Sequence, residues 1–110
     1  MPISLRVRDE SHRHIAWLAD VASSTPGDVP ALKADMLPLG RYPEYPLMAY
    51  IDPHGDTCFN RAQSAALFAE MVRWADRTPD PRLPLLNRAV EILIAAHVRT
   101  PHRYLWFVGD

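Results

Sequence analysis

The sequence has few of the residues that reactive or ligand-cradling sites usually need. Cys58 is the only cysteine, which excludes an internal disulfide and a thiolate metal cluster within one chain. Lys33 is the only lysine among 12 basic residues, which argues against Schiff-base chemistry. Four glycines are few for a loop that cradles nucleotide phosphates. We therefore expect no cofactor, and we interpret Cys58 as a small buried structural side chain.

Long hydrophobic runs and a strong excess of one charge are also missing. No apolar stretch approaches the roughly 20 residues that span a bilayer. The N-terminal segment also lacks the apolar region of a signal peptide, so we expect a cytoplasmic protein without membrane contact. The net charge of −1 supplies no general field that attracts polyanions. We therefore expect no nucleic-acid partner.

The hydrophobic pattern predicts a single α+β domain over residues 1–110. We expect a small, mostly antiparallel sheet of about four strands, with helices packed on one face and the order β-α-β-β-α-α-β. The 23–46 connection, which contains five prolines, is either a functional loop or a segment packed across the edge of the core. Strands are predicted at 3–9, 47–51, 56–59 and 103–108, and helices at 11–22, 61–77 and 84–100.

The segment 50–60 carries the most specific local signal. Asp52-Pro53-His54-Gly55 fits a type I turn, and Gly55 in the left-handed region would complete a bulged hairpin between the 47–51 and 56–59 strands. Asn60 is predicted to cap the following helix, with Gln63 as its capping-box partner.

Two segments together resemble a group of small bacterial proteins whose function is not assigned. The first is Ile51-Asp52-Pro53-His54-Gly55-Asp56-Thr57-Cys58-Phe59-Asn60, and the second is Tyr104-Leu105-Trp106-Phe107-Val108-Gly109-Asp110. The group shares an Asp-Pro-x-Gly-Asp-Thr-x-Phe-Asn segment and an aromatic C-terminal strand. The resemblance covers about a sixth of the chain and carries no catalytic residue with it. It implies that the two segments lie together.

The polar side chains of the turn also form a candidate site. Asp52, His54 and Asp56 offer mixed oxygen and nitrogen ligands, which Asp110 or His102 could complete if the last strand lies beside them. The alternative is that Asp52 accepts backbone hydrogen bonds within the turn. Thr57 belongs to the same cluster, as a binding residue or as a partner of Asp56.

Catalytic chemistry has weaker support. The carboxylates and a histidine could form an acid–base pair, with Ser64 or Cys58 as nucleophile, but no sequence motif of a known catalytic class is present. His97 lies on the apolar stripe of its helix, where packing with one hydrogen bond is the simpler interpretation.

Arginines near the C-terminal strand raise the question of nucleic acid. Arg6, Arg8, Arg13 and Arg103 would form a patch beside Tyr104 and Trp106 if the first and last strands are neighbours. The alternative is a solvated arginine face with the aromatic rings in the core. The overall acidity favours that alternative.

Aromatic residues favour protein recognition instead. Tyr42 and Tyr45 lie in a stiff proline-flanked loop, and Trp17, Trp74 and Trp106 add more rings than a small core readily holds. These rings could equally close over the edge of the core. We predict a small non-enzymatic binding protein of the inhibitor, immunity or accessory type, whose partner is another protein or a second copy. The alternative is an enzyme or metal-binding protein that uses the 52–56 cluster with Asp110.

Overall fold

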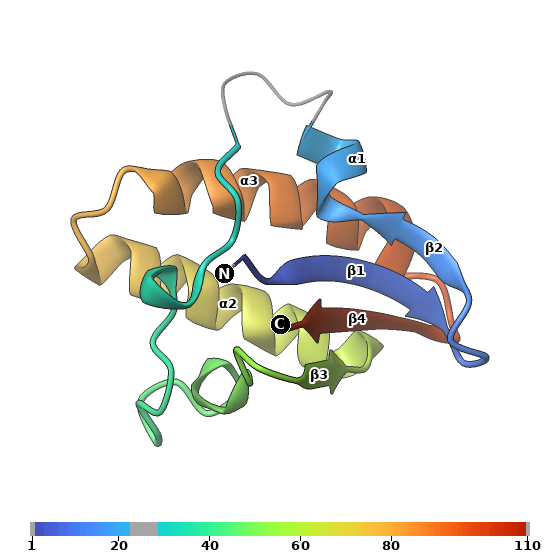
Figure 1. Cartoon of the computed structure of the whole chain (residues 1–110), viewed down its shortest axis with the longest axis horizontal. Helices are drawn as coiled ribbons and strands as arrows, with labels where there is room; N and C mark the ends of the chain where they lie inside the picture. The colour runs from blue at the N-terminus through green and yellow to red at the C-terminus, as the bar shows by residue number, and fades with distance from the viewer. Residues whose placement is uncertain (1, 23–28, 110) are drawn as a thin grey trace.

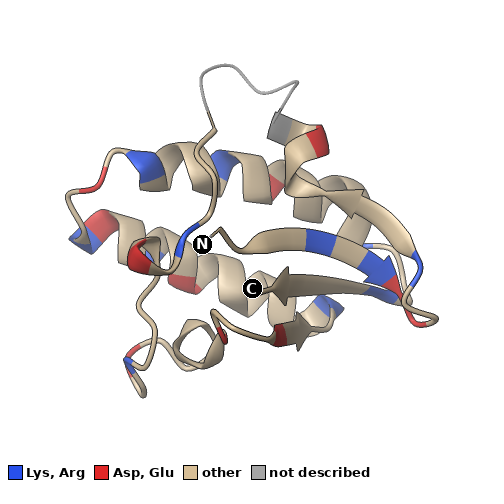
Figure 2. Ribbon diagram, in the orientation of Figure 1, with Lys and Arg blue, Asp and Glu red and all other residues tan. Residues whose placement is uncertain are grey.

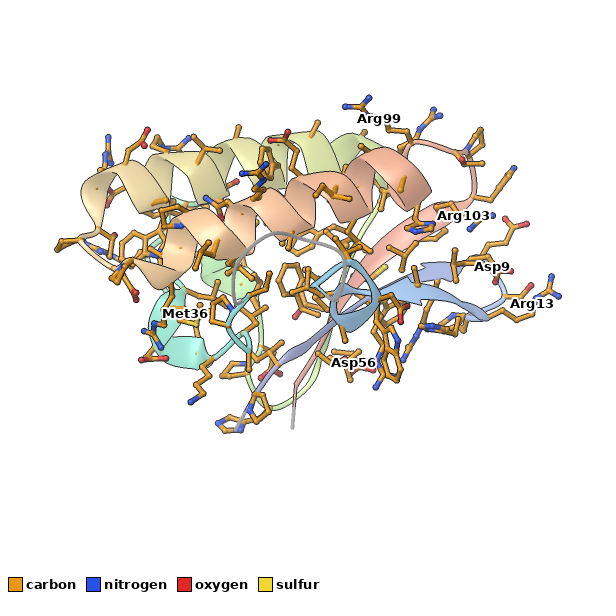
Figure 3. The ribbon with its side chains drawn as sticks, turned by 90° about the horizontal axis from the view of Figure 1, so that it is seen from above. Asp9, Arg13, Met36, Asp56, Arg99 and Arg103 are labelled. Carbon is orange, nitrogen blue, oxygen red and sulfur yellow. The ribbon has the colours of Figure 1, made fainter. Side chains whose placement is uncertain are left out.

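The fold is a single antiparallel sheet with helices packed on one side. The computed structural model describes residues 2–22 and 29–109. The sheet lies in front of the two long helices in Figure 1, and the view from above in Figure 3 shows the helices as a separate layer. This arrangement confirms the predicted α+β class with four antiparallel strands.

The strands pair in the order β2-β1-β4-β3, so the first and last strands of the chain are central neighbours. Their bounds are Ser4–Asp9 for β1, His14–Trp17 for β2, Asp56–Phe59 for β3 and Arg103–Val108 for β4. The register places Arg6 opposite Trp17 on one side and opposite Trp106 on the other. It also places Cys58 opposite Trp106. One row of side chains therefore crosses all four strands.

Two long helices form the covering layer. They are α2 at Arg61–Arg77 and α3 at Arg82–Leu93, and α3 continues into a π-helical turn, η3, at Ile94–Val98. The capping box predicted at the start of α2 is confirmed, because Asn60 Oδ1 accepts the Gln63 N–H and Gln63 Oε1 accepts the Asn60 N–H. Shorter helical segments are α1 at Leu18–Ala22, η1 at Ala34–Met36 and η2 at Met48–Tyr50.

The core lies between the helices and one face of the sheet. Alternate residues of β1 and β4 point into it, and all are almost completely buried. Each side chain of this size stabilises the fold by about 1.5–3 kcal/mol when it is removed from water. The sheet contributes Leu5, Val7, Leu105 and Phe107, with Ile3 just before β1, and the helices contribute Leu67, Met71, Leu86, Val90 and Leu93.

Residues 11–22 do not form one helix, so that prediction is wrong. They form β2 followed by the single turn α1. The cause lies partly in Asp9, whose Oδ1 accepts the N–H groups of Ser11 and Arg13 at 2.9 and 3.0 Å. These bonds turn the chain back along β1, where Ala16 pairs with Val7 and enters the core. The helical spacing of the apolar residues did not reveal this strand pairing.

The predicted strand at 47–51 is also wrong, because these residues form the short helical turn η2. The carboxylate of Glu70, which is buried on α2, accepts the Leu47 and Met48 N–H groups at 3.0–3.1 Å. Two acceptors aimed at successive N–H groups favour a helical start over an extended chain. No hairpin therefore joins 47–51 to β3, and β3 pairs with β4 instead.

The described part of the 23–46 connection packs across the edge of the core, as one of the two interpretations predicted. Leu32, Met36 and Leu37 are buried, and the Trp74 indole N–H donates to the Met36 carbonyl at 3.0 Å. The predictions for 23–28 lie outside the described residues. Within the described ranges, no helix is both long enough and apolar enough to cross a membrane.

Candidate functional site

The turn at 52–55 is held by bonds within the fold. Asp52 Oδ1 accepts the His54 N–H at 2.8 Å, and the Asp52 N–H donates to Thr57 Oγ1 at 2.9 Å. The Gly109 N–H then donates to the Gly55 carbonyl at 2.7 Å. A Cβ at Gly109 would come within 2.6 Å of the Pro53 carbonyl carbon, so this contact requires glycine. The expected left-handed Gly55 is wrong, since Gly40 is the only glycine with positive φ among the described residues.

The same bonds weaken the metal hypothesis. Across 2–22 and 29–109, no group of three His, Cys, Asp or Glu side chains could hold a metal ion. His102 lies before β4, where its Nδ1 is 3.0 Å from Glu10 Oε2, whereas Asp56 pairs with Val108 at the far end of that strand. Asp110 lies outside the described residues. Asp52, His54 and Asp56 are exposed turn and edge residues, and Thr57 serves the turn.

The two tyrosines proposed as contact residues have opposite environments. Tyr45 is completely buried and packs edge-on against Trp74, with ring centroids 5.5 Å apart. Its ring is therefore part of the core and is not available to a partner. Tyr42 is 61% exposed and lies against Tyr50, which is 66% exposed, at 5.6 Å. The exposed aromatic pair of this loop is thus Tyr42 with Tyr50.

A larger polar and aromatic surface lies on the side of the sheet that the helices leave uncovered. Side chains there alternate along each strand with the buried ones that face the helices. Figure 2 shows basic residues along β1, with acidic residues at its far end and on β3. We call this surface the open face, and it consists of Arg6, Arg8, Trp17, Cys58, Tyr104 and Trp106.

Two arginines of the open face stack on tryptophans of the neighbouring strands. The Arg6 guanidinium carbon lies 5.1 Å from the Trp17 ring centroid, and the Arg8 guanidinium carbon lies 5.1 Å from that of Trp106. The His12 ring also contacts Trp106, with centroids 5.2 Å apart. A stacked guanidinium keeps its N–H edges directed outward, where they can bind carboxylates in bidentate fashion.

These arginines have no carboxylate of their own in the described part of the chain. The Arg6 Nε donates to Ser4 Oγ at 2.9 Å, and none of the described ion pairs includes Arg6 or Arg8. The nearby Asp9 is already engaged, because its carboxylate accepts the Arg13 and Ser11 N–H groups and pairs with the Arg13 guanidinium. These contacts, the Arg13 N–H first, lower the pKa of Asp9. Arg6 and Arg8 therefore present positive charge that no ion pair within the described residues neutralises.

Cys58 lies on the open face and is exposed, which corrects its interpretation as a buried residue. Partial burial still raises the pKa of its thiol, while the charge of Arg8 acts in the opposite direction. The thiol is thus a reporter of the Arg8 charge on the same surface.

Sequence reasoning found part of this surface and interpreted it incorrectly. The condition that β1 and β4 are neighbours is met, but Tyr104 and Trp106 do not lie in the core, as the preferred interpretation held. Leu105 and Phe107 fill the core side of β4, so the other rings must point outward. Trp17 was missed because its segment was predicted to be helical. The alternation of arginines in β1 was the signal that could have revealed the open face.

A separate groove of about 400 Å³ lies between α2 and the π-helical turn η3. Its floor includes Phe68 and Ile94, and both Arg61 and Glu91 line it. Arg61 already donates to the Arg99 carbonyl at 3.2 Å. The groove thus combines both charge signs with an engaged arginine and indicates no particular ligand.

Comparison with protein-family models, curated proteins and solved structures found no match for this chain. The resemblance to small bacterial proteins therefore stays a prediction. Its implication that the two segments lie together is confirmed, because β3 pairs with β4 along its length and Gly109 bonds to Gly55.

Proposed function

We propose that this chain is a non-enzymatic binding protein that recognises another protein through the open face of its sheet. Such a role is that of an inhibitor, immunity-type or accessory protein. The observation that carries the proposal is the pair of arginines stacked on Trp17 and Trp106 without ion-pair partners among the described residues. Trp, Tyr and Arg are the residues that contribute most often to protein-binding hot spots.

Two physical features support binding over a purely structural role for this surface. A guanidinium that rests on an indole has already lost much of its conformational freedom, so a partner orders less on binding. Trp17 is 40% exposed although its indole N–H is bonded to Asp20 Oδ1 at 2.8 Å. Its ring is thus held in place while a large apolar area stays in contact with water.

The only cysteine provides a direct test. A benzophenone maleimide attached to Cys58 at about pH 8, where more of the thiol is ionised, places a photo-crosslinker beside Trp106. The labelled protein is irradiated in native lysate, and conjugates are identified by mass spectrometry. We expect a specific protein conjugate that is lost when the unlabelled chain is added in excess and when Arg6→Gln and Arg8→Gln are combined.

The matched control moves the probe to the helix layer. Cys58→Ser combined with Ala66→Cys places the same label on the exposed side of α2. Capture of the same proteins from both positions, or no conjugate at Cys58 that unlabelled chain competes away, would contradict the proposal.

A further inference from the structure

We infer that the partner of the open face presents a pair of separated carboxylates, as an acidic extended segment of a different protein does. This inference rests on the proposed function and adds the chemistry of the partner. Its starting point is that Arg6 and Arg8 each hold a charge without an ion-pair carboxylate in the described residues. Arginine side chains bind carboxylates through two parallel N–H···O bonds.

The arginines are too far apart to share one acidic group. They occupy alternate positions of β1, so their Cα atoms are about 7 Å apart. Arg6 leans over Trp17 of β2 and Arg8 over Trp106 of β4, so their guanidinium groups diverge toward opposite strands. Two glutamates at alternate positions of an extended chain also have Cα atoms about 7 Å apart, and their side chains can diverge in the same way to reach both arginines. A single small anion can satisfy only one arginine.

The charge of the open face disfavours a second copy of this chain as the occupant. A two-fold symmetric contact brings the same surface of each copy together. Because Arg6 and Arg8 lie on one of the two central strands, a two-fold axis through the middle of this surface would bring them close to the same arginines of the other copy, and like charges brought together in an interface are unfavourable. The occupant is therefore a different protein with acidic residues.

The surroundings of the arginines also disfavour nucleic acid. A strand of nucleic acid requires positive charge along its whole path. Here the arginines of β1 lie between Asp56 on β3 and Asp20 just after β2, and Asp9 at the end of β1 is already paired with Arg13. The net charge of the chain is −1. A short positive patch with acidic residues on both sides fits a few discrete carboxylates better than a continuous phosphate backbone.

Disulfide tethering at Cys58 tests this chemistry without knowledge of the natural partner. Three short peptides of the form Cys-Gly-Gly-Xaa-Thr-Xaa-Thr, with Xaa as Glu, Gln or Lys, are each supplied as the mixed disulfide with 2-mercaptoethanol. The Cys58 thiolate attacks the peptide sulfur and releases 2-mercaptoethanol, and free 2-mercaptoethanol is then added to reverse the exchange. The concentration of 2-mercaptoethanol that releases half of each peptide measures its non-covalent affinity for the open face. We expect the Glu peptide to resist at least tenfold more reductant than the Gln peptide, and the Lys peptide to resist less than either.

Variants assign the effect to the arginines. In the combined Arg6→Gln and Arg8→Gln variant, the Glu and Gln peptides should be half released at the same 2-mercaptoethanol concentration, so that the ratio of the two concentrations falls to one. This ratio corrects for any change in the reactivity of the thiol, because both peptides are attached to the same residue. Arg13→Gln, which removes an arginine already paired with Asp9 at 3.2 Å, should leave most of the ratio intact. The ratio should also fall as salt is raised from 0.05 to about 0.5 M, because salt screens such attraction.

Each other outcome overturns the inference. Equal release of Glu and Gln peptides would show that the face does not select carboxylates. A thiol-linked oligothymidylate that resists more reductant than the Glu peptide would assign the face to nucleic acid. Photo-crosslinking of Cys58 to a second copy in the purified protein would assign it to self-association. A foreign protein captured at Cys58 together with equal peptide release would overturn this inference and leave the proposed function standing.

Discussion

The two faces of the sheet are built from the same strands but differ in composition and in exposure to water. On the covered face, Leu105 and Phe107 are completely buried and need only shape and volume to fit the helices. On the open face, Tyr104 and Trp106 from the same strand lie among arginines and share their surface with water. Adjacent residues of one strand therefore serve different ends.

The difference indicates that the covered face serves mainly stability and that the open face is free to serve recognition. A change in the volume of a side chain on the covered face leaves a cavity or a clash and so destabilises the fold. A side chain on the open face can change without leaving a cavity. Substitutions on the covered face should therefore lower the free energy of unfolding, and substitutions on the open face should lower affinity for a partner.

The largest effect that tests this separation comes from neighbours in β4. Phe107→Ala should lower the free energy of unfolding by about 3–5 kcal/mol, because it leaves a cavity against the helices. Trp106→Ala should lower it by about 1–2 kcal/mol, through lost stacking and strand preference. Urea denaturation followed by circular dichroism measures both. Equal losses would show that the open face is as much a part of the core as the covered one.

Much of the fold could be predicted from local pattern. The alternation in β1 and β4, the capping box of α2 and the apolar periodicity of α2 and α3 predicted these elements, because each buries one face. The strand β3 was placed correctly, but as the return of a hairpin that does not form. Two segments were assigned wrongly, each for its own reason. The turn η2 depends on Glu70, which lies 23 residues beyond Leu47, and a contact so distant in sequence leaves no local signal. The strand β2 depends on a local turn at Asp9 and on pairing with β1, and the helical spacing of its apolar residues hid both.

The candidate site was less predictable than the fold for a related reason. Asp52, His54 and Asp56 stood out because they are close in sequence, yet the turn itself uses Asp52 and no three-ligand cluster forms within the described residues. The open face gathers residues from four separate strands, so neither Trp17 nor Cys58 could be linked to Arg6 before the strand order was known.

The next effect concerns Glu70 of α2, the buried carboxylate that holds the turn η2. Glu70→Gln should lower the free energy of unfolding by about 2 kcal/mol, because an amide accepts the Leu47 and Met48 N–H groups less strongly than a carboxylate. Glu91→Gln, at an exposed position of α3, should change it by less than about 0.5 kcal/mol. Chemical denaturation measures both variants, and an equal effect of the two would remove Glu70 as the anchor of η2.

A smaller effect compares an unpaired donor in the core with one on the open face. Among the described side chains, the buried Tyr45 hydroxyl and Trp106 indole N–H have no hydrogen-bond partner. Tyr45→Phe should leave stability unchanged or raise it by up to about 1 kcal/mol, because an unpaired buried hydroxyl is costly. Trp106→Phe removes the same kind of cost but also weakens the stacking with Arg8, so we expect a small net loss. A loss above about 1 kcal/mol for Tyr45→Phe, measured by thermal or urea unfolding, would show that its hydroxyl does have a partner.

The smallest effect reads the charge of the open face directly. Burial raises the pKa of the Cys58 thiol and the positive charge of Arg8 lowers it, so Arg8→Met should raise that pKa further. Only the thiolate reacts with iodoacetamide, so the variant should react more slowly at pH 8 and its rate profile should move to higher pH. Arg13→Met, whose charge is paired with Asp9, should leave the profile in place. If both variants shift the rate profile equally, the thiol reports only the overall charge of the molecule. If Arg8→Met alone shifts it, the charge that we assign to partner recognition is localised on the open face.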